Sequence, residues 1–366
     1  MTTLKEGAMG RFQVIDADAH VIEPLSIYPE YVDPRWRGRV PTGRPYKMLN
    51  VGRPLGMPDA TDEVPRPLEN SATLPGGAYD PHVRVKDMDR EGIDVGVCFP
   101  SLATSLCCLE DIGLEAAMLT AYNRWMADHC APYPDRLKGV LMTTMRDMAL
   151  AVEEIRRCAR EPWVVGICVS GHMDDKNLDH PFFHPLWAEA QAQGLPILVH
   201  AGTARPPYPL GTFELGENLF LLHSMQHPLE QQRAVAALIG GGVLDRFPEV
   251  RFGFLESGCG WVPWFMERLD ERFEKLRHHV PLCKKSPREH MTGPQCFFAC
   301  DPDESSVEHF VKVMGEDRLI YASDYPHWDA KFPDTVTMLA SRPTLTDGQK
   351  AKILGANAKQ LFTRLP

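Results

Sequence analysis

Three ionisable residues alternate with apolar ones near the amino terminus, in Val14-Ile15-Asp16-Ala17-Asp18-Ala19-His20. The β-branched pair that opens this stretch is typical of a buried strand. Because side chains alternate along a strand, Asp16, Asp18 and His20 are expected on one face. Burying all three is costly unless a cation compensates, and carboxylate and imidazole groups both bind divalent metals. The stretch predicts a metal site; its alternative interpretation is an acid–histidine pair at a strand end.

Further ionisable residues follow apolar runs later in the chain. His200 closes the run 196–200, Glu256 follows 250–255 and Asp324 follows 319–323, while Glu23 lies just beyond the first strand. In a parallel barrel such strand ends meet at one mouth. The predicted metal ligands are Asp18, His20, Glu23, His200, Glu256 and Asp324. Glu23 has an alternative interpretation as a helix or loop cap, and Glu256 as a carboxylate that orients a histidine.

Eight short apolar strands that alternate with helices would position these residues. Strands that are apolar on both faces and separated by helices indicate parallel pairing, and eight of them predict a (β/α)8 TIM barrel. A doubly wound open sheet is less favoured because no GxGxxG turn follows the first strand. The expected strands are 14–20, 94–99, 137–142, 164–169, 196–200, 250–255, 295–300 and 319–323, and the expected helices are 83–91, 113–129, 149–160, 181–193, 229–244, 261–277, 304–314 and 345–362.

A long irregular segment, 24–80, interrupts this pattern after the first strand. It is rich in Pro, Gly and Arg and has no periodicity, as is typical of a lid or substrate-binding loop. We therefore interpret 1–366 as one metal-dependent barrel domain with 24–80 as its insertion.

Composition and charge limit the kinds of molecule that this protein is expected to bind. The 366 residues carry a formal net charge of −10, which disfavours nucleic acid or an anionic membrane as a partner. No secretory h-region or apolar run of membrane-spanning length occurs, and the ten cysteines form no CxxC pair. These features predict a cytoplasmic enzyme with a small-molecule substrate. The apolar start of the helix 261–277 is compatible with core packing or with a homodimer contact.

Five motifs together resemble the amidohydrolase superfamily, and within it the amidohydrolase-2 (aminocarboxymuconate-semialdehyde decarboxylase-like) family. The resemblance implies that Asp18, His20, His200 and Asp324 bind a metal. The motifs are Ile15-Asp16-Ala17-Asp18-Ala19-His20, Gly194-Leu195-Pro196-Ile197-Leu198-Val199-His200, Gly242-Val243-Leu244-Asp245-Arg246-Phe247-Pro248, Trp261-Val262-Pro263-Trp264 with Arg268-Leu269-Asp270, and Tyr321-Ala322-Ser323-Asp324-Tyr325-Pro326-His327.

Two positions depart from the family pattern. Asp18 stands where the family usually has the first of two histidines, and Glu256-Ser257-Gly258 stands where a catalytic His–Gly pair is usual. His223 or His227 is a candidate substitute for the missing histidine, with His227 favoured by its His-Pro setting. The resulting excess of carboxylates favours Fe²⁺ or Mn²⁺ over Zn²⁺ and leaves room for one or two ions.

Hydrolysis is the main functional hypothesis from the sequence. A metal-activated water would attack an amide, ester, lactone or thioester. The resemblance implies that Asp324 is the general base, and His227 or Glu256 would assist the leaving group. The alternative is non-oxidative decarboxylation of an unsaturated or aromatic acid, a reaction that the family resemblance implies. A catalytically inactive scaffold is the third hypothesis, and the intact ligand set argues against it.

Overall fold

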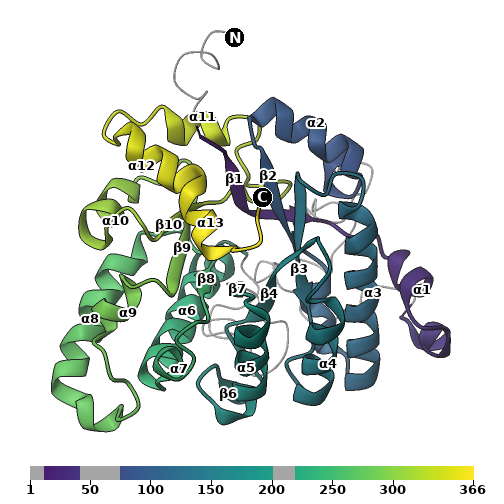
Figure 1. The fold of residues 1–366 in the computed structure, drawn as a ribbon, viewed down its shortest axis with the longest axis horizontal. Coiled ribbons are helices and arrows are strands. Elements are labelled where there is room, and N and C mark those ends of the chain that lie inside the picture. Colours follow the sequence, from purple (N-terminus) through teal and green to yellow (C-terminus); the bar gives the residue numbers. More distant parts are fainter. Residues whose placement is uncertain (1–11, 42–74, 201–218) are drawn as a thin grey trace, which may run out of the picture.

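Eight parallel strands form the centre of the molecule, with helices around them (Figure 1). The computed structural model describes residues 12–41, 75–200 and 219–366. The strands are β1 (Ile15–Val21), β2 (Val95–Pro100), β3 (Leu137–Met142), β4 (Val164–Ser170), β7 (Ile197–His200), β8 (Phe252–Phe254), β9 (Cys296–Cys300) and β10 (Leu319–Tyr321), hydrogen-bonded in that order, and β5 (His172–Met173) pairs with β6 (Lys176–Asn177) in a separate ribbon.

Helices connect successive strands and cover the outside of this sheet. Nearly every strand residue is buried, as expected for a parallel sheet covered on both faces. The helices are α1 (Ile27–Tyr31), α2 (Pro81–Glu91), α3 (Ile112–Cys130), α4 (Met148–Cys158), α5 (His184–Gln193), α6 (Leu219–Gly240), α7 (Val243–Arg246), α8 (Trp261–Leu276), α9 (Pro287–Met291), α10 (Val307–Met314), α11 (Thr335–Ala340), α12 (Asp347–Ala351) and α13 (Asn357–Leu361). The predicted (β/α)8 TIM barrel is confirmed.

The barrel is closed where β1 meets the segment that follows β10. The N–H of Asp324 donates to the carbonyl of Asp18 (3.0 Å), and the N–H of His20 donates to the carbonyl of Tyr325 (2.7 Å). The side chain of Asp16 accepts from the N–H (2.9 Å) and hydroxyl of Ser323. These bonds fix the end of β1 against the residues after β10.

Local sequence signals explain the position of α2, which packs beside this closure. The Asp80 carboxylate accepts from the N–H groups of His82 and Val83, and Pro81 occupies the first helical position. Gly92 ends the helix with a φ of +89°, a conformation that glycine adopts without steric cost. The helix therefore begins and ends where its sequence dictates.

Differences from the predicted elements have local causes. The helix expected at 229–244 begins earlier and continues through Pro228, a residue that normally ends a helix. It then breaks at Gly242, whose φ is +71°, so that α7 is a separate turn. The last predicted helix divides into α12, a π-helical turn (Lys352–Ala356) and α13. Helices α1, α9 and α11 were not predicted because five or six residues show no measurable periodicity.

The described parts of the 24–80 insertion pack against the barrel's outer helices. The Tyr31 hydroxyl donates to Asp128 of α3 (2.9 Å), and Arg39 forms an ion pair with Asp111 (2.6 Å). Residues 42–74 lie outside the described part of the chain, so the lid function stays a prediction. In the described residues, no helix combines the length and apolarity that crossing a membrane requires.

Candidate metal centre

Six side chains gather at the carboxyl ends of β1, β7, β8 and β10. The candidate ligand atoms of Asp18, His20 and His200 all lie within 4.8 Å of one another. A second group shares His20, and its ligand atoms also lie within 4.8 Å of one another. This group is His20, Glu256, Asp324 and His327. Because His20 belongs to both groups, the two form one continuous cluster, and five of the six predicted metal ligands are in it.

Short distances between nitrogen and oxygen atoms define the centre of the cluster. His20 Nε2 lies 3.1 Å from His200 Nε2, 3.4 Å from Asp18 Oδ1 and 3.5 Å from Asp324 Oδ1. His200 Nε2 lies 3.2 Å from Glu256 Oε2. The two imidazole nitrogens and the carboxylate oxygens thus face a common point, as ligands of one ion do.

An unpaired buried atom tests whether these residues suit a cation. Asp18 Oδ1 is buried without a hydrogen-bond partner among the described residues. Burial, with the negative charge of Asp324, raises the pKa of Asp18 and of Glu256 well above the usual range. Burial lowers the pKa of His20, which keeps its imidazole in the neutral, metal-binding form. A divalent cation supplies the positive charge that this set of carboxylates lacks, so the residues fit a divalent metal.

Two cluster residues have an unusual backbone conformation. Glu256 and Asp324 have φ values of +53° and +56°, in the left-handed region that residues other than glycine seldom adopt. Such a conformation persists only where the surrounding structure enforces it, and it is found most often at functional sites. The strand-end geometry is therefore consistent with a site built for chemistry.

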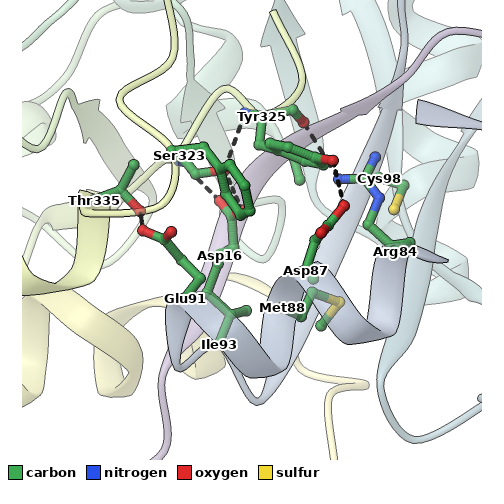
Figure 2. A pocket seen from close by; sticks show the side chains of 13 residues that line it. Asp16, Arg84, Asp87, Met88, Glu91, Ile93, Cys98, Ser323, Tyr325 and Thr335 are labelled. Carbon is green, nitrogen blue, oxygen red and sulfur yellow. Dashed lines mark hydrogen bonds between the residues drawn. The ribbon is translucent and has the colours of Figure 1, made fainter. Parts of the chain in front are cut away.

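A buried arginine holds the closure of the barrel behind the cluster. Arg84 of α2 is 2% exposed and donates to the carbonyls of His20 and Tyr325 (3.3 Å for Tyr325). Figure 2 shows it beside Tyr325, whose hydroxyl donates to Asp87 (2.5 Å), at the wall of a small cavity that Asp16 also lines. Arg84 thereby fixes the spacing between the chain segments that carry His20 and Asp324.

Arg84→Met is expected to weaken Mn²⁺ binding by about 10–100-fold, the usual cost of losing a residue that orients metal ligands. The substitution keeps an apolar stem but removes both bonds to the closure. Isothermal titration with Mn²⁺ measures the change. Arg156→Met is the matched control, because Arg156 is a 65% exposed side chain paired with Glu189. Equal affinities in the two variants would show that Arg84 does not position the ligands.

A buried glutamine supports the other side of the cluster. Gln231 of α6 donates through Nε2 to the carbonyls of Val199 (2.8 Å) and Leu255 (2.9 Å). These residues immediately precede His200 and Glu256. One amide group therefore links the ends of β7 and β8 and sets the relative position of two cluster residues.

Glu23, predicted as a metal ligand, belongs to neither ligand group among the described residues. Its Oε1 accepts from the N–H groups of Leu102 (2.9 Å) and Ala103, and its Oε2 accepts from the N–H of Ser101 (3.2 Å). Burial raises the pKa of this carboxyl to about 7. The structure corresponds to the alternative interpretation of Glu23 as a loop cap, because both oxygens are occupied by backbone donors.

Glu23→Ala is expected to lower the free energy of unfolding by about 3 kcal/mol, because it leaves three backbone donors without their acceptor. Metal content per chain should stay unchanged. Urea unfolding and elemental analysis measure the two quantities, with the exposed Glu30→Ala as control. Loss of metal from a folded Glu23→Ala protein would restore Glu23 as a ligand.

One histidine of the cluster was not predicted from the sequence, and the roles expected of His227 and His223 stay predictions. His327 lies in the cluster, with Nδ1 2.7 Å from Asp324 Oδ1 and Nε2 3.0 Å from Ser101 Oγ. The sequence feature that could have indicated it is the end of the last motif, Tyr325-Pro326-His327, but no function was predicted for this histidine. His227 lies on α6, half-buried, and is in neither ligand group. The side chain of His223 lies outside the described residues.

Curated relatives are decarboxylases. This chain is 25% identical over 295 residues to 2-amino-3-carboxymuconate-6-semialdehyde decarboxylase of Dictyostelium discoideum, covering 79% of this chain and 78% of that protein. It is 24% identical over 324 residues to gamma-resorcylate decarboxylase of a Rhizobium species, and the match covers 82% of this chain and 95% of that protein.

Solved structures share the fold over almost the full length. A 5-carboxyvanillate decarboxylase from Novosphingobium aromaticivorans, with bound manganese and 3-methoxy-4-hydroxy-5-nitrobenzoic acid, has a TM-score of 0.74 at 21% identity, with 98% of this chain and 99% of that chain covered. An amidohydrolase from Mycobacterium avium subsp. paratuberculosis has a TM-score of 0.76 at 19% identity. The match covers 96% of this chain and 99% of that chain.

These comparisons correct the main functional hypothesis. Hydrolysis of an amide, ester, lactone or thioester was expected, but the relatives named above are decarboxylases. The ligand set alone could not make this distinction, because carboxylates and imidazoles around a metal serve both reactions. The hydrolase hypothesis is wrong, and the alternative is the better supported one.

The family resemblance noted in the sequence is confirmed by a match over nearly the whole chain. The amidohydrolase family model matches residues 15–364, from the first residue of β1 to the residues after α13. The match includes every residue of the cluster and the closure between β1 and β10. The chain is an enzyme of the amidohydrolase superfamily. It belongs to the amidohydrolase family, in the branch that contains the decarboxylases named above.

Proposed function

We propose that this enzyme catalyses the metal-dependent, non-oxidative decarboxylation of an aromatic or unsaturated carboxylic acid. The observation that carries the proposal is a partly buried carboxylate–imidazole cluster at the barrel mouth of a chain whose relatives are decarboxylases. Glu256 stands where the family resemblance implies a catalytic histidine, and His327 places an imidazole in the same cluster.

Asp18, His20, His200 and Asp324 would hold one divalent ion, with Glu256 as a further oxygen donor. When bound, the ion supplies a positive charge that orients the substrate carboxylate and withdraws electron density from the reacting carbon. Manganese is the proposed metal, because the cluster is rich in oxygen donors and a structural neighbour binds manganese.

Asp324 is the proposed proton donor. The bond between the carboxylate carbon and the adjacent carbon breaks, CO₂ leaves, and the electron pair that remains takes the proton from Asp324. The reaction is redox-neutral and needs no oxidant or reductant. His327, 2.7 Å from Asp324 through Nδ1, orients this carboxyl and returns a proton to it from solvent.

A substrate panel tests the proposal. Mn²⁺-loaded protein is incubated with hydroxybenzoates and with an unsaturated dicarboxylate, and released CO₂ is measured. Release from at least one acid, lost when His200 is replaced by alanine, is the expected result. Absence of CO₂ release across the panel from protein that holds its metal would count against decarboxylation of these substrate classes.

A further inference from the structure

Three potential metal ligands meet at a second place, away from the barrel mouth. They come from α7, from the segment between α8 and α9, and from α9. Their ligand atoms all lie within 4.8 Å of one another, and Asp245 Oδ2 is 3.2 Å from His290 Nε2. We propose that Asp245, Cys283 and His290 bind Zn²⁺ or a similar divalent transition-metal ion. The proposal is independent of the decarboxylase function.

This triad lies at the opposite end of the barrel from the catalytic cluster. Helix α7 leads into the start of β8, and α9 leads into the start of β9. Catalytic groups of a barrel lie at the carboxyl ends of the strands, whereas the starts of the strands lie at the other face. Gln295, just before β9, donates to the carbonyls of Phe247 and Val250 and so holds the two entry segments together. An ion here would tie these segments and would not contact the substrate.

Backbone contacts position the three side chains. The N–H of Lys284 donates to Asp245 Oδ2 (2.7 Å), which fixes the carboxylate beside Cys283. Gly242 has a φ of +71°, and a Cβ there would collide with Leu282 at 2.5–2.7 Å, so α7 and this segment are in close contact. A capping box at Ser286 starts α9, the helix that carries His290.

The donor types match a borderline-soft metal. Carboxylate oxygen, thiolate sulfur and imidazole nitrogen are all zinc ligands, and the thiolate disfavours Mg²⁺ and Ca²⁺. Cys283 and His290 are each 3% exposed, and the Asp245 side chain is 7% exposed. Two anionic ligands balance the charge of a divalent ion, and water would complete four-coordination.

Metal binding requires the loss of one proton. Without an ion, burial and the charge of Asp245 raise the pKa of the Cys283 thiol to about 11, and the thiol donates to the carbonyl of Lys285. Binding exchanges the S–H bond for a metal–sulfur bond and releases the proton to solvent. The alternative is a metal-free, hydrogen-bonded triad in which this thiol stays protonated.

Cobalt binding distinguishes the two states. Co²⁺ bound to a thiolate gives a near-ultraviolet charge-transfer band, and the two ligand groups at the barrel mouth contain no cysteine. Full-length protein titrated with Co²⁺ should show this band, and Cys283→Ser should lose the band together with one equivalent of metal per chain. Cys130→Ser, another buried cysteine, is the control and should keep both.

A second variant guards against misfolding of Cys283→Ser. His290→Gln retains the thiol and a polar partner for Asp245, and should lower the intensity of the band and the affinity for Co²⁺. Zn²⁺ should also slow alkylation of Cys283 in the native protein. A wild-type protein without the charge-transfer band, or a band that persists in folded Cys283→Ser, would overturn the proposal.

Discussion

Asp324→Asn is expected to lower kcat for CO₂ release by a factor of about 10²–10⁴, the usual contribution of a positioned proton donor. The amide cannot deliver the proton, yet it preserves size and shape. Asparagine also tolerates the left-handed conformation that Asp324 adopts at a φ of +56°, so the backbone should be retained. Steady-state CO₂ release at saturating Mn²⁺ measures the effect.

A matched control separates chemistry from surface charge in this experiment. Asp303→Asn removes a carboxylate that is 47% exposed and pairs with Lys331 at 3.5 Å, and kcat should be unchanged. Metal analysis of Asp324→Asn shows whether the ion is still bound. A metal-loaded Asp324→Asn enzyme with more than a tenth of the wild-type kcat would exclude Asp324 as the proton donor.

Removal of the metal by a chelator is expected to abolish CO₂ release and to destabilise the fold. The cluster then leaves Asp18, Glu256 and Asp324 close together without a compensating cation. Ligand binding to the native state alone stabilises it by about 2.7 kcal/mol when the ligand is at 100 times its Kd. Urea unfolding with and without Mn²⁺ measures this difference, and added Mn²⁺ should restore activity.

Mg²⁺ at the same concentration is the control, because the imidazoles of His20 and His200 favour a transition metal over magnesium. Mg²⁺ should stabilise the protein less than Mn²⁺ does. A chelated protein that keeps full activity and the same unfolding free energy would contradict the assignment of the cluster as a metal centre.

Strand ends were predictable from the sequence because apolar runs and ionisable residues alternate in a simple way. His200, Glu256 and Asp324 each follow such a run, and barrel topology brings these positions to one mouth. Asp16 shows the limit of this reasoning. The pairing of β1 with β2 is irregular between Asp16 and Ala19, so Asp16 bonds to Ser323 while Asp18 and His20 join the cluster.

Contacts between segments distant in sequence were not predictable in the same way. Glu23 is bonded to backbone groups almost 80 residues away, and periodicity holds no information on such partners. His327 lies three residues beyond its partner Asp324, and the return of the chain beside β1 brings it to Ser101, 226 residues away in sequence. Decarboxylation was only the alternative hypothesis from the sequence, because the choice of reaction depends on how the substrate is held and the ligand types are common to hydrolases and decarboxylases.

The measurement that most directly tests the proposed reaction is decarboxylation in D₂O, with the product analysed by NMR. Cleavage of a carbon–carbon bond followed by protonation of carbon predicts one deuterium at the position that carried the carboxylate, together with one equivalent of CO₂. The active, Mn²⁺-loaded enzyme should give this product, and the Asp324→Asn enzyme should form it at least about 100-fold more slowly. A product without deuterium at that carbon, or turnover without CO₂, would contradict the proposed function.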